Sequence, residues 1–139
     1  MIGVVLGSAF DGLEAELAPH AVPTAWGAVT LHRAPRGWVL FRHGLPHRWL
    51  PNQIPWRAHA AALAEVGVQS LLVTSSVGLL QPDLPLDTPL VVDDLVWLDN
   101  RLPDGTAATM FTEPTVGQGH LVLEEGLFSR ALTAQVESL

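Results

Sequence analysis

The chain of 139 residues contains no cysteine, no lysine and no tyrosine. Without cysteine there is neither a disulfide bond nor a thiolate metal ligand, which fits the cytoplasmic location that we expect. Seven basic side chains, all arginine, oppose fourteen carboxylates, so the formal net charge is −7. Such a chain lacks the broad basic face that neutralises nucleic-acid phosphates, and we expect no nucleic-acid partner.

Long apolar runs are lacking as well. No run approaches the ~20 apolar residues of a membrane-spanning helix. The first ten residues lack the positive charge of a secretory signal, and Gly7 and Ser8 interrupt their apolar run. We therefore expect no membrane partner. The chain is 48% hydrophobic and long enough for a core, so we predict a single domain over residues 1–139.

Short apolar runs that end at glycine or at polar turn residues are typical of buried strands. Residues 54–66 have the clearest helix pattern, because Pro55 suits a first turn, alanine dominates the middle and Gly67 follows the end. Strands alternating with helices predict an α/β sheet covered by helices. The predicted strands are 1–6, 25–31, 37–41 and 70–76, and a last helix is predicted over 128–139.

Positive charge is concentrated in one part of the chain. Five of the seven arginines lie between positions 33 and 57, and the stretch FRHGLPHRWLP over residues 41–51 adds two histidines. In an acidic protein this concentration indicates either an anion site or surface ion pairs, and surface ion pairs add little stability. The five are Arg33, Arg36, Arg42, Arg48 and Arg57.

Polar residues follow three of the predicted strands directly, as Gly7-Ser8, Arg42-His43 and Ser75-Ser76. Ligands of open α/β sheets bind at the carboxyl ends of the strands, so the three clusters could meet in one crevice. Arginine offers a planar fork of donors for two oxygens of phosphate or carboxylate, and glycine lets the backbone approach a ligand. The pattern predicts an oxyanion cradle, although each cluster alone also fits an ordinary turn.

The six histidines do not form a metal-binding motif. His43 and His47 are four apart, but Gly44 and Pro46 argue against a helix that would place them on one face. There is no HExxH sequence, and we expect no metal. His59 lies on the helix predicted over 54–66, and we expect it at the surface or at an interface.

Taken in order, these motifs resemble the trimeric purine nucleoside phosphorylases, and specifically their methylthioadenosine phosphorylase branch. The matching text is IGVVLGSAFDGLE, then TAWGAVTL, then VLFRHGLPHRWLPNQIPWRAHAAALAEVGVQSLLVTSSVGLLQPDLPLDTPLVVDD. The RHGxxH segment followed by an alanine-rich helix is its most specific part. The resemblance implies a nucleoside phosphorylase-like α/β fold, with a three-layer-type mixed β-sheet flanked by helices. It corresponds to the N-terminal half of the family, truncated to about half the family length.

The resemblance implies phosphorolysis, in which phosphate attacks the anomeric carbon of a purine nucleoside or of 5′-methylthioadenosine and releases base and a pentose 1-phosphate. Inorganic phosphate is then the co-substrate, and no other cofactor is implied. His47 would lie near the nucleoside, as would His120, in a region that reaches into a neighbouring subunit's site. The phosphate-binding residues implied are Ser8, Arg42, His43, Ser75 and Ser76; no catalytic residue is assigned.

The chain departs from the family pattern in several places. Ala9 replaces a glycine of the phosphate turn, Pro55-Trp56 replaces an Asn-Tyr pair, and Asp87-Thr88 stands where the family has Gly-Asp. The family also continues for a second half that carries the groups for base and ribose and a further phosphate contact. We therefore expect a homo-oligomer (trimer or hexamer) or a companion chain that supplies the C-terminal half.

Two hypotheses of different classes follow from the sequence. The chain is a nucleoside phosphorylase-like enzyme whose site is completed by an oligomer or a companion chain, or it is a non-catalytic phosphate- or nucleoside-binding module that keeps only the anion cradle. A neighbouring reading frame that encodes the second half would favour the enzyme. For the chain alone we expect little or no activity.

Overall fold

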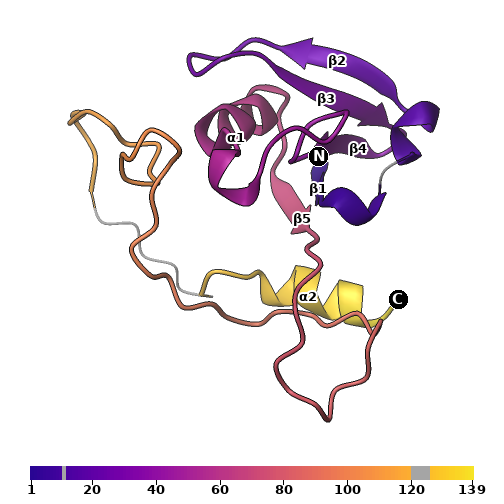
Figure 1. Cartoon of the computed structure of the whole chain (residues 1–139). Coiled ribbons are helices and arrows are strands. Elements are labelled where there is room, and N and C mark those ends of the chain that lie inside the picture. Colours follow the sequence, from indigo (N-terminus) through magenta and orange to yellow (C-terminus); the bar gives the residue numbers. More distant parts are fainter. Residues whose placement is uncertain (11, 120–125) are drawn as a thin grey trace. The chain divides into compact units, whose positions relative to one another are not determined.

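The computed structural model describes residues 1–10, 12–119 and 126–139 (Figure 1). The chain forms two compact units. The first comprises Met1–Val77 with Arg101–Met110, and the second comprises Gly78–Asn100 with Phe111–Leu139. The single domain over residues 1–139 stays a prediction.

The first unit is built on a five-stranded sheet in the order β2-β3-β4-β1-β5. β1 pairs in parallel with β4 on one side and with β5 on the other, while β2, β3 and β4 form an antiparallel meander. The predicted mixed sheet is therefore confirmed. The strands are β1 (Ile2–Leu6), β2 (Ala18–Val22), β3 (Val29–Ala34), β4 (Gly37–Phe41) and β5 (Ser70–Val73).

Two strands differ from their prediction. β3 begins at Val29 rather than at residue 25, because a turn occupies the residues before it: Trp26 N donates to Thr24 Oγ1, and Thr24 Oγ1 donates to Gly27 O. β2 was not expected from the sequence. It lies at an edge of the sheet and is mostly exposed, so it has no apolar alternation, and an edge strand tolerates Pro19.

The helices are α1 (Trp56–Glu65) and α2 (Arg130–Glu137), with three short 3-10 turns, η1 (Ser8–Phe10), η2 (Leu13–Glu16) and η3 (Pro51–Gln53). α1 starts two residues later than predicted, because Ile54 is extended. Gly67 follows its end with φ 75°, a conformation that favours glycine. α2 is capped by Ser129, whose side chain accepts from Leu132 N at 3.5 Å.

α1 covers one face of the sheet (Figure 1). Leu31 and Leu40 point to this face and pack with Ala62 and Leu63 of α1 in the main hydrophobic cluster. The opposite face carries a smaller cluster centred on Val39 and two neighbours from the ends of β1 and β4. Burial of such side chains is the main stabilising term of the unit, roughly 1.5–3 kcal/mol for each large aliphatic group.

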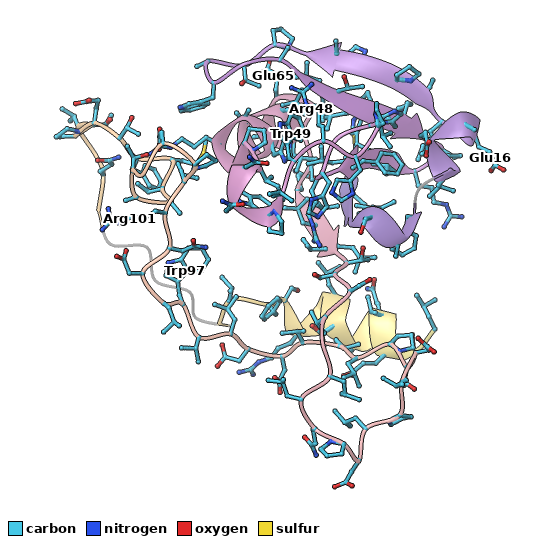
Figure 2. The ribbon with its side chains drawn as sticks, viewed as in Figure 1. Glu16, Arg48, Trp49, Glu65, Trp97 and Arg101 are labelled. Atoms are coloured by element: carbon cyan, nitrogen blue, oxygen red, sulfur yellow. The ribbon has the colours of Figure 1, made fainter. Side chains whose placement is uncertain are left out.

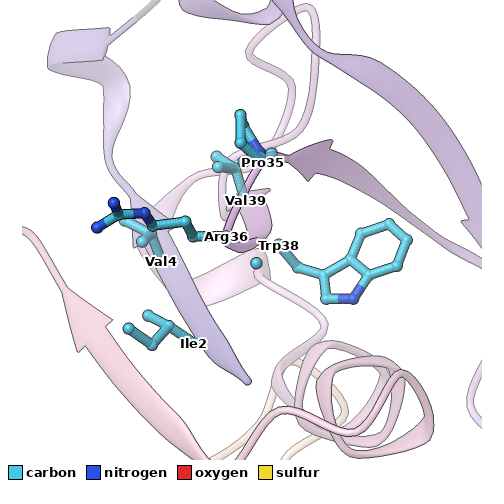
Figure 3. A pocket seen from close by; sticks show the side chains of 8 residues that line it. Ile2, Val4, Pro35, Arg36, Trp38 and Val39 are labelled. Atoms are coloured by element: carbon cyan, nitrogen blue, oxygen red, sulfur yellow. The ribbon is translucent and has the colours of Figure 1, made fainter.

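The face away from α1 also carries an open apolar groove of about 390 Å³ near the start of β1 (Figure 3). Ile2, Val4 and Val39 line it, and Pro35 and Arg36 of the β3–β4 turn lie at its border. Exposed apolar surface of this kind often marks a contact surface.

The second unit has no buried residue among those that the structure describes. Residues 88–98, the apolar stretch TPLVVDDLVWL, contain neither helix nor strand, and Trp97 is 65% exposed (Figure 2). Asp87 has φ 59°, in the left-handed region, at the position where the family pattern has glycine; aspartate is among the residues that tolerate this region best. No described helix of the chain is both long and apolar enough for a bilayer.

Arg57 of α1 holds residues 101–110 against the rest of the first unit. Its Nε donates to Thr109 O at 2.8 Å and its Nη2 donates to Ala107 O at 3.0 Å. Its Nη1 lies 3.9 Å from a carboxylate oxygen of Asp104. Asp104 also accepts from Thr106, and these hydrogen bonds lower the pKa of its carboxyl group. The role of this arginine is therefore structural.

His59 was expected at the surface or at an interface, and this prediction was wrong. The side chain is 3% exposed and lies on the buried face of α1, against the rings of Trp49 (5.8 Å) and Trp56 (6.2 Å). Among the described residues its Nδ1 has no hydrogen-bond partner. Burial lowers the pKa of His59 to about 4, because the apolar surroundings disfavour the charged ring.

We predict that His59 makes the protein sensitive to mild acid. Above pH 6.5 its ring is neutral in both the folded and the unfolded state, so it adds nothing to the pH dependence. As the pH falls from 6.5 towards 4, only the unfolded state takes up the proton, and the free energy of unfolding falls by about 3 kcal/mol through this group. Urea denaturation at pH 7 and pH 4 should show wild type losing about that much more stability than His59→Gln.

The exposed His47 supplies the control, since His47→Gln should retain the full acid sensitivity of wild type. If wild type and His59→Gln lost equal amounts of unfolding free energy between pH 7 and pH 4, folding would not lower the pKa of His59.

Candidate functional site

The carboxyl ends of the three parallel strands meet at one edge of the sheet, as the sequence predicted. Leu6 of β1 is in register with Phe41 of β4, and Val5 of β1 with Val73 of β5. Backbone pairing continues one residue further on both sides of β1: Arg42 N donates to Leu6 O at 3.1 Å, and Thr74 N donates to Val5 O at 2.9 Å. Gly7, Arg42 and Thr74 therefore begin the three turns side by side.

Arg42 is the centre of this edge. Its Nη1 donates to Thr74 O at 2.7 Å and its Nη2 donates to Ser75 Oγ at 3.1 Å. Its Nε donates to His43 Nε2 at 3.2 Å. These three bonds use three of the five N–H donors of a guanidinium, and all three acceptors are neutral. They include no carboxylate, so the alternative that Arg42 serves in an ordinary surface ion pair gains no support from them.

Gly7 lies directly beneath the guanidinium. A Cβ atom placed on Gly7 would stand 3.0 Å from Nη2 of Arg42 and 3.5 Å from its Cζ. That spacing is tighter than ordinary van der Waals contact, so the close approach depends on the missing side chain. The glycine that ends β1 is therefore required by the position of Arg42.

His43 is buried and both of its ring nitrogens are engaged. Nε2 receives the hydrogen bond from Arg42, and Nδ1 lies 2.8 Å from the carbonyl oxygen of Trp49. The ring of His47 stacks on that of His43, with centroids 4.5 Å apart and planes 22° from parallel. His47 itself is exposed.

The remaining predicted site residues are placed as follows. Ser8 is exposed at the start of η1, directly after Gly7. Ser75 and Ser76 are both exposed after the end of β5, and Ser75 is the one bound to Arg42. His120 lies outside the described residues. The structure thus brings Gly7, Arg42, His43 and Ser75 together; their roles towards phosphate and nucleoside stay predictions.

Two residues of this site were missed from the sequence. Thr74 contributes through its backbone carbonyl, which any residue possesses, so no sequence signal could have identified it. Trp49 contributes its carbonyl to His43 and its ring to the buried side of α1. Its position six residues after His43, within the basic stretch, is the one sequence feature that pointed to it. No cluster of three or more histidine and acidic groups suited to a metal ion occurs within residues 1–10, 12–119 and 126–139.

The arrangement has the chemistry of an anion site. A fixed guanidinium at the strand ends still has two N–H donors beyond those that it uses, and the Ser8 hydroxyl and Ser75-Ser76 turn lie on the adjoining strand ends. Charge-assisted hydrogen bonds of this type are about twice as strong as neutral ones.

Comparison with curated proteins gives a consistent result. The chain is 38% identical over 127 residues to the S-methyl-5′-thioadenosine phosphorylase of Tuber melanosporum, which covers 84% of this chain and 40% of that protein. It is 34% identical over 126 residues to S-methyl-5′-thioadenosine phosphorylase 2 of Puccinia graminis f. sp. tritici, covering 82% of this chain and 41% of that protein. The chain is a relative of the methylthioadenosine phosphorylases. It spans about two fifths of the length of these relatives.

Among solved structures, a methylthioadenosine phosphorylase from an antarctic soil metagenomic library is 26% identical, with a TM-score of 0.41, over 52% of this chain and 28% of that one. No protein-family model matches the chain.

Two departures from the methylthioadenosine phosphorylase pattern now have a structural description. Ala9, which replaces a glycine, lies within the 3-10 turn η1, and among the described residues the only non-glycine with positive φ is Asp87. The backbone at Ala9 is thus compatible with alanine. Pro55 and Trp56 lie at the start of α1, where proline is well tolerated.

We predict that Gly7→Ala displaces Arg42 without unfolding the chain. The added methyl group would stand 3.0 Å from Nη2, which donates to Ser75, so we expect the guanidinium to shift and its hydrogen bonds, including the Nε–H bond to His43, to weaken. Hydrogen exchange of the Arg42 Nε–H, measured by NMR, should become roughly tenfold faster. The free energy of unfolding should change by only about 1 kcal/mol.

Gly78→Ala is the matched control, because a Cβ at Gly78 meets no atom within 4 Å. Equal Nε–H exchange in Gly7→Ala and wild type would mean that the contact between Gly7 and Arg42 does not constrain the guanidinium.

Proposed function

We propose that this chain provides the phosphate-binding part of a nucleoside phosphorylase site, one that cleaves 5′-methylthioadenosine or a purine nucleoside by phosphorolysis. The observation that carries the proposal is the guanidinium of Arg42, held at the ends of three parallel strands by neutral acceptors only. The relationship to methylthioadenosine phosphorylases supports the choice of reaction. The activity is that of a pentosyltransferase in purine salvage.

The proposed role of the chain is to bind and orient phosphate. Arg42 would hold two phosphate oxygens with its two remaining N–H donors, and Ser8 and the Ser75-Ser76 turn would contribute hydroxyls and backbone N–H groups. A phosphate fixed beside the sugar attacks the anomeric carbon, and its negative charge stabilises the oxocarbenium-like transition state. Bond formation to phosphate and departure of the base give pentose 1-phosphate and free purine.

In this proposal, the groups that bind the purine and the ribose lie outside the phosphate cradle. His47, exposed and stacked on His43, is the described residue best placed to reach a nucleoside beside the bound phosphate. We propose that further contacts come from a homo-oligomer or a companion chain, in a cytoplasmic assembly. His120 is proposed to contact the nucleoside from a neighbouring subunit.

The alternative function is a non-catalytic module that binds phosphate or a nucleoside through the same cradle. The exposed apolar side chains of the second unit, such as Trp97 and Val96, favour a chain that works through protein contacts. The two functions differ in turnover and not in phosphate binding, so they are separable by assay.

We predict that phosphate stabilises the protein through Arg42. A ligand present at a hundred times its Kd stabilises the folded state by about 2.7 kcal/mol, which thermal unfolding detects as a rise in Tm. Arg42→Ala should abolish this phosphate-dependent rise. Arg36→Ala, at the β3–β4 turn, is the control and should keep it. A rise of equal size in Arg42→Ala would exclude Arg42 as a phosphate ligand.

We predict that the 139-residue chain alone releases little or no adenine from 5′-methylthioadenosine and little or no hypoxanthine from inosine in the presence of phosphate. The chain alone lacks the proposed partner contacts to base and ribose. Product release can be followed chromatographically, with and without any companion chain. Turnover by the chain alone of roughly 1 per second or faster, as in ordinary enzymes, would contradict this prediction and show that the cradle is sufficient.

A further inference from the structure

We propose that the ring of His43 is a positioning group that orients the Arg42 guanidinium for an oxyanion and does not itself donate to the anion. The proposal rests on the proposed function, since it concerns the same site. It assigns His43 a role different from the phosphate contact that the sequence suggested.

The hydrogen bonds of His43 determine its protonation pattern. A guanidinium nitrogen can only donate, so Nε2 of His43 must accept from Arg42 Nε and carry no hydrogen. A carbonyl oxygen can only accept, so Nδ1 must carry the hydrogen and donate to Trp49 O. The ring is therefore the neutral Nδ1–H tautomer. Both nitrogens are used within the protein, and neither has an N–H left for an anion.

The bond to His43 holds the Nε end of the guanidinium, which the other two contacts of Arg42 do not reach. Thr74 O and Ser75 Oγ hold the far end of the guanidinium, and Ser75 is an exposed turn residue. The Nε bond to a buried ring holds the near end and sets the plane of the fork. A guanidinium that is already held in the binding orientation loses less conformational freedom when it binds two oxygens of an anion. This preorganisation increases affinity.

His43 is itself anchored to the core. Its backbone carbonyl accepts from Arg48 N at 2.9 Å and from Trp49 N at 3.1 Å, while Gly44, with φ 80°, lets the chain reverse between them. Arg48 and Trp49 lie next to each other (Figure 2), and the guanidinium of Arg48 lies over the Trp49 ring, 4.6 Å from its centroid. The Trp49 ring also contacts the ring of His59 of α1, with centroids 5.8 Å apart. The loop over residues 44–49 thus holds the ring of His43 in place, and the Trp49 carbonyl of this loop selects the tautomer of the ring.

The test uses two substitutions that each keep one of the two hydrogen bonds. In His43→Gln the side-chain oxygen can take the place of Nε2 and accept from Arg42 Nε. In His43→Asn the shorter amide can replace Nδ1 and donate to Trp49 O, but it leaves Arg42 Nε without its acceptor. If His43 positions Arg42, the Kd for inorganic phosphate from calorimetry should stay within about threefold of wild type in His43→Gln and weaken roughly tenfold in His43→Asn.

Equal weakening in the two variants would overturn the positioning role. The pair His20→Gln and His20→Asn, at an exposed histidine of β2, is the matched control and should bind phosphate as wild type does.

NMR of the wild-type protein provides a readout that does not depend on any variant. The ¹⁵N shifts of His43 should report the neutral Nδ1–H tautomer both without phosphate and with it, and the Arg42 Nε–H should exchange slowly in both states. An Nε2–H tautomer or a doubly protonated ring in the phosphate-bound protein would make the His43 ring an anion donor and overturn the proposal.

Phosphate binding by wild type separates failure of the proposed function from failure of the positioning role. If wild type shows no saturable binding of phosphate, the phosphorylase site itself is excluded. If wild type binds phosphate and the Gln and Asn variants are equally weakened, the site stands and only the positioning role falls.

Discussion

The parallel pairing of β1 with both β4 and β5 is the constraint on which the site depends. It sets three strand ends in one row, and the backbone bonds from Arg42 and Thr74 to β1 extend that register into the turns. Arg42 then closes the row by bonding to the turn after β5 and by lying over the glycine after β1. A change in register by one residue would reverse the direction of every side chain there.

Much of this edge followed from residue types alone. Apolar runs that end at glycine or at polar turn residues located β1, β4 and β5. The rule that ligands bind at the carboxyl ends of strands predicted that the polar residues after these strands lie together. Alanine content and the following Gly67 located α1 to within two residues at its start. These features could be predicted because each one arises from the preferences of a short stretch of residues.

Other features arise from contacts that no local pattern records. The burial of His59 depends in part on the ring of Trp49, which lies outside the helix, and the sequence of the helix gives no sign of that contact. The tautomer of His43 depends on a backbone carbonyl. The apolar stretch over residues 88–98 has no regular structure, because an apolar run forms a strand only where a partner strand is available.

The neutral surroundings of Arg42 have an electrostatic consequence for the choice of ligand. The protein carries a net charge of −7, so its field repels large polyanions and acidic protein surfaces at a distance. That field is screened beyond about 8–10 Å at physiological ionic strength, whereas the guanidinium acts at contact distance. A polyanion carries many charges that this field repels, whereas a small anion carries only one or two. The net charge of the protein therefore disfavours phosphate-bearing polymers much more than it disfavours an ion of the size of phosphate.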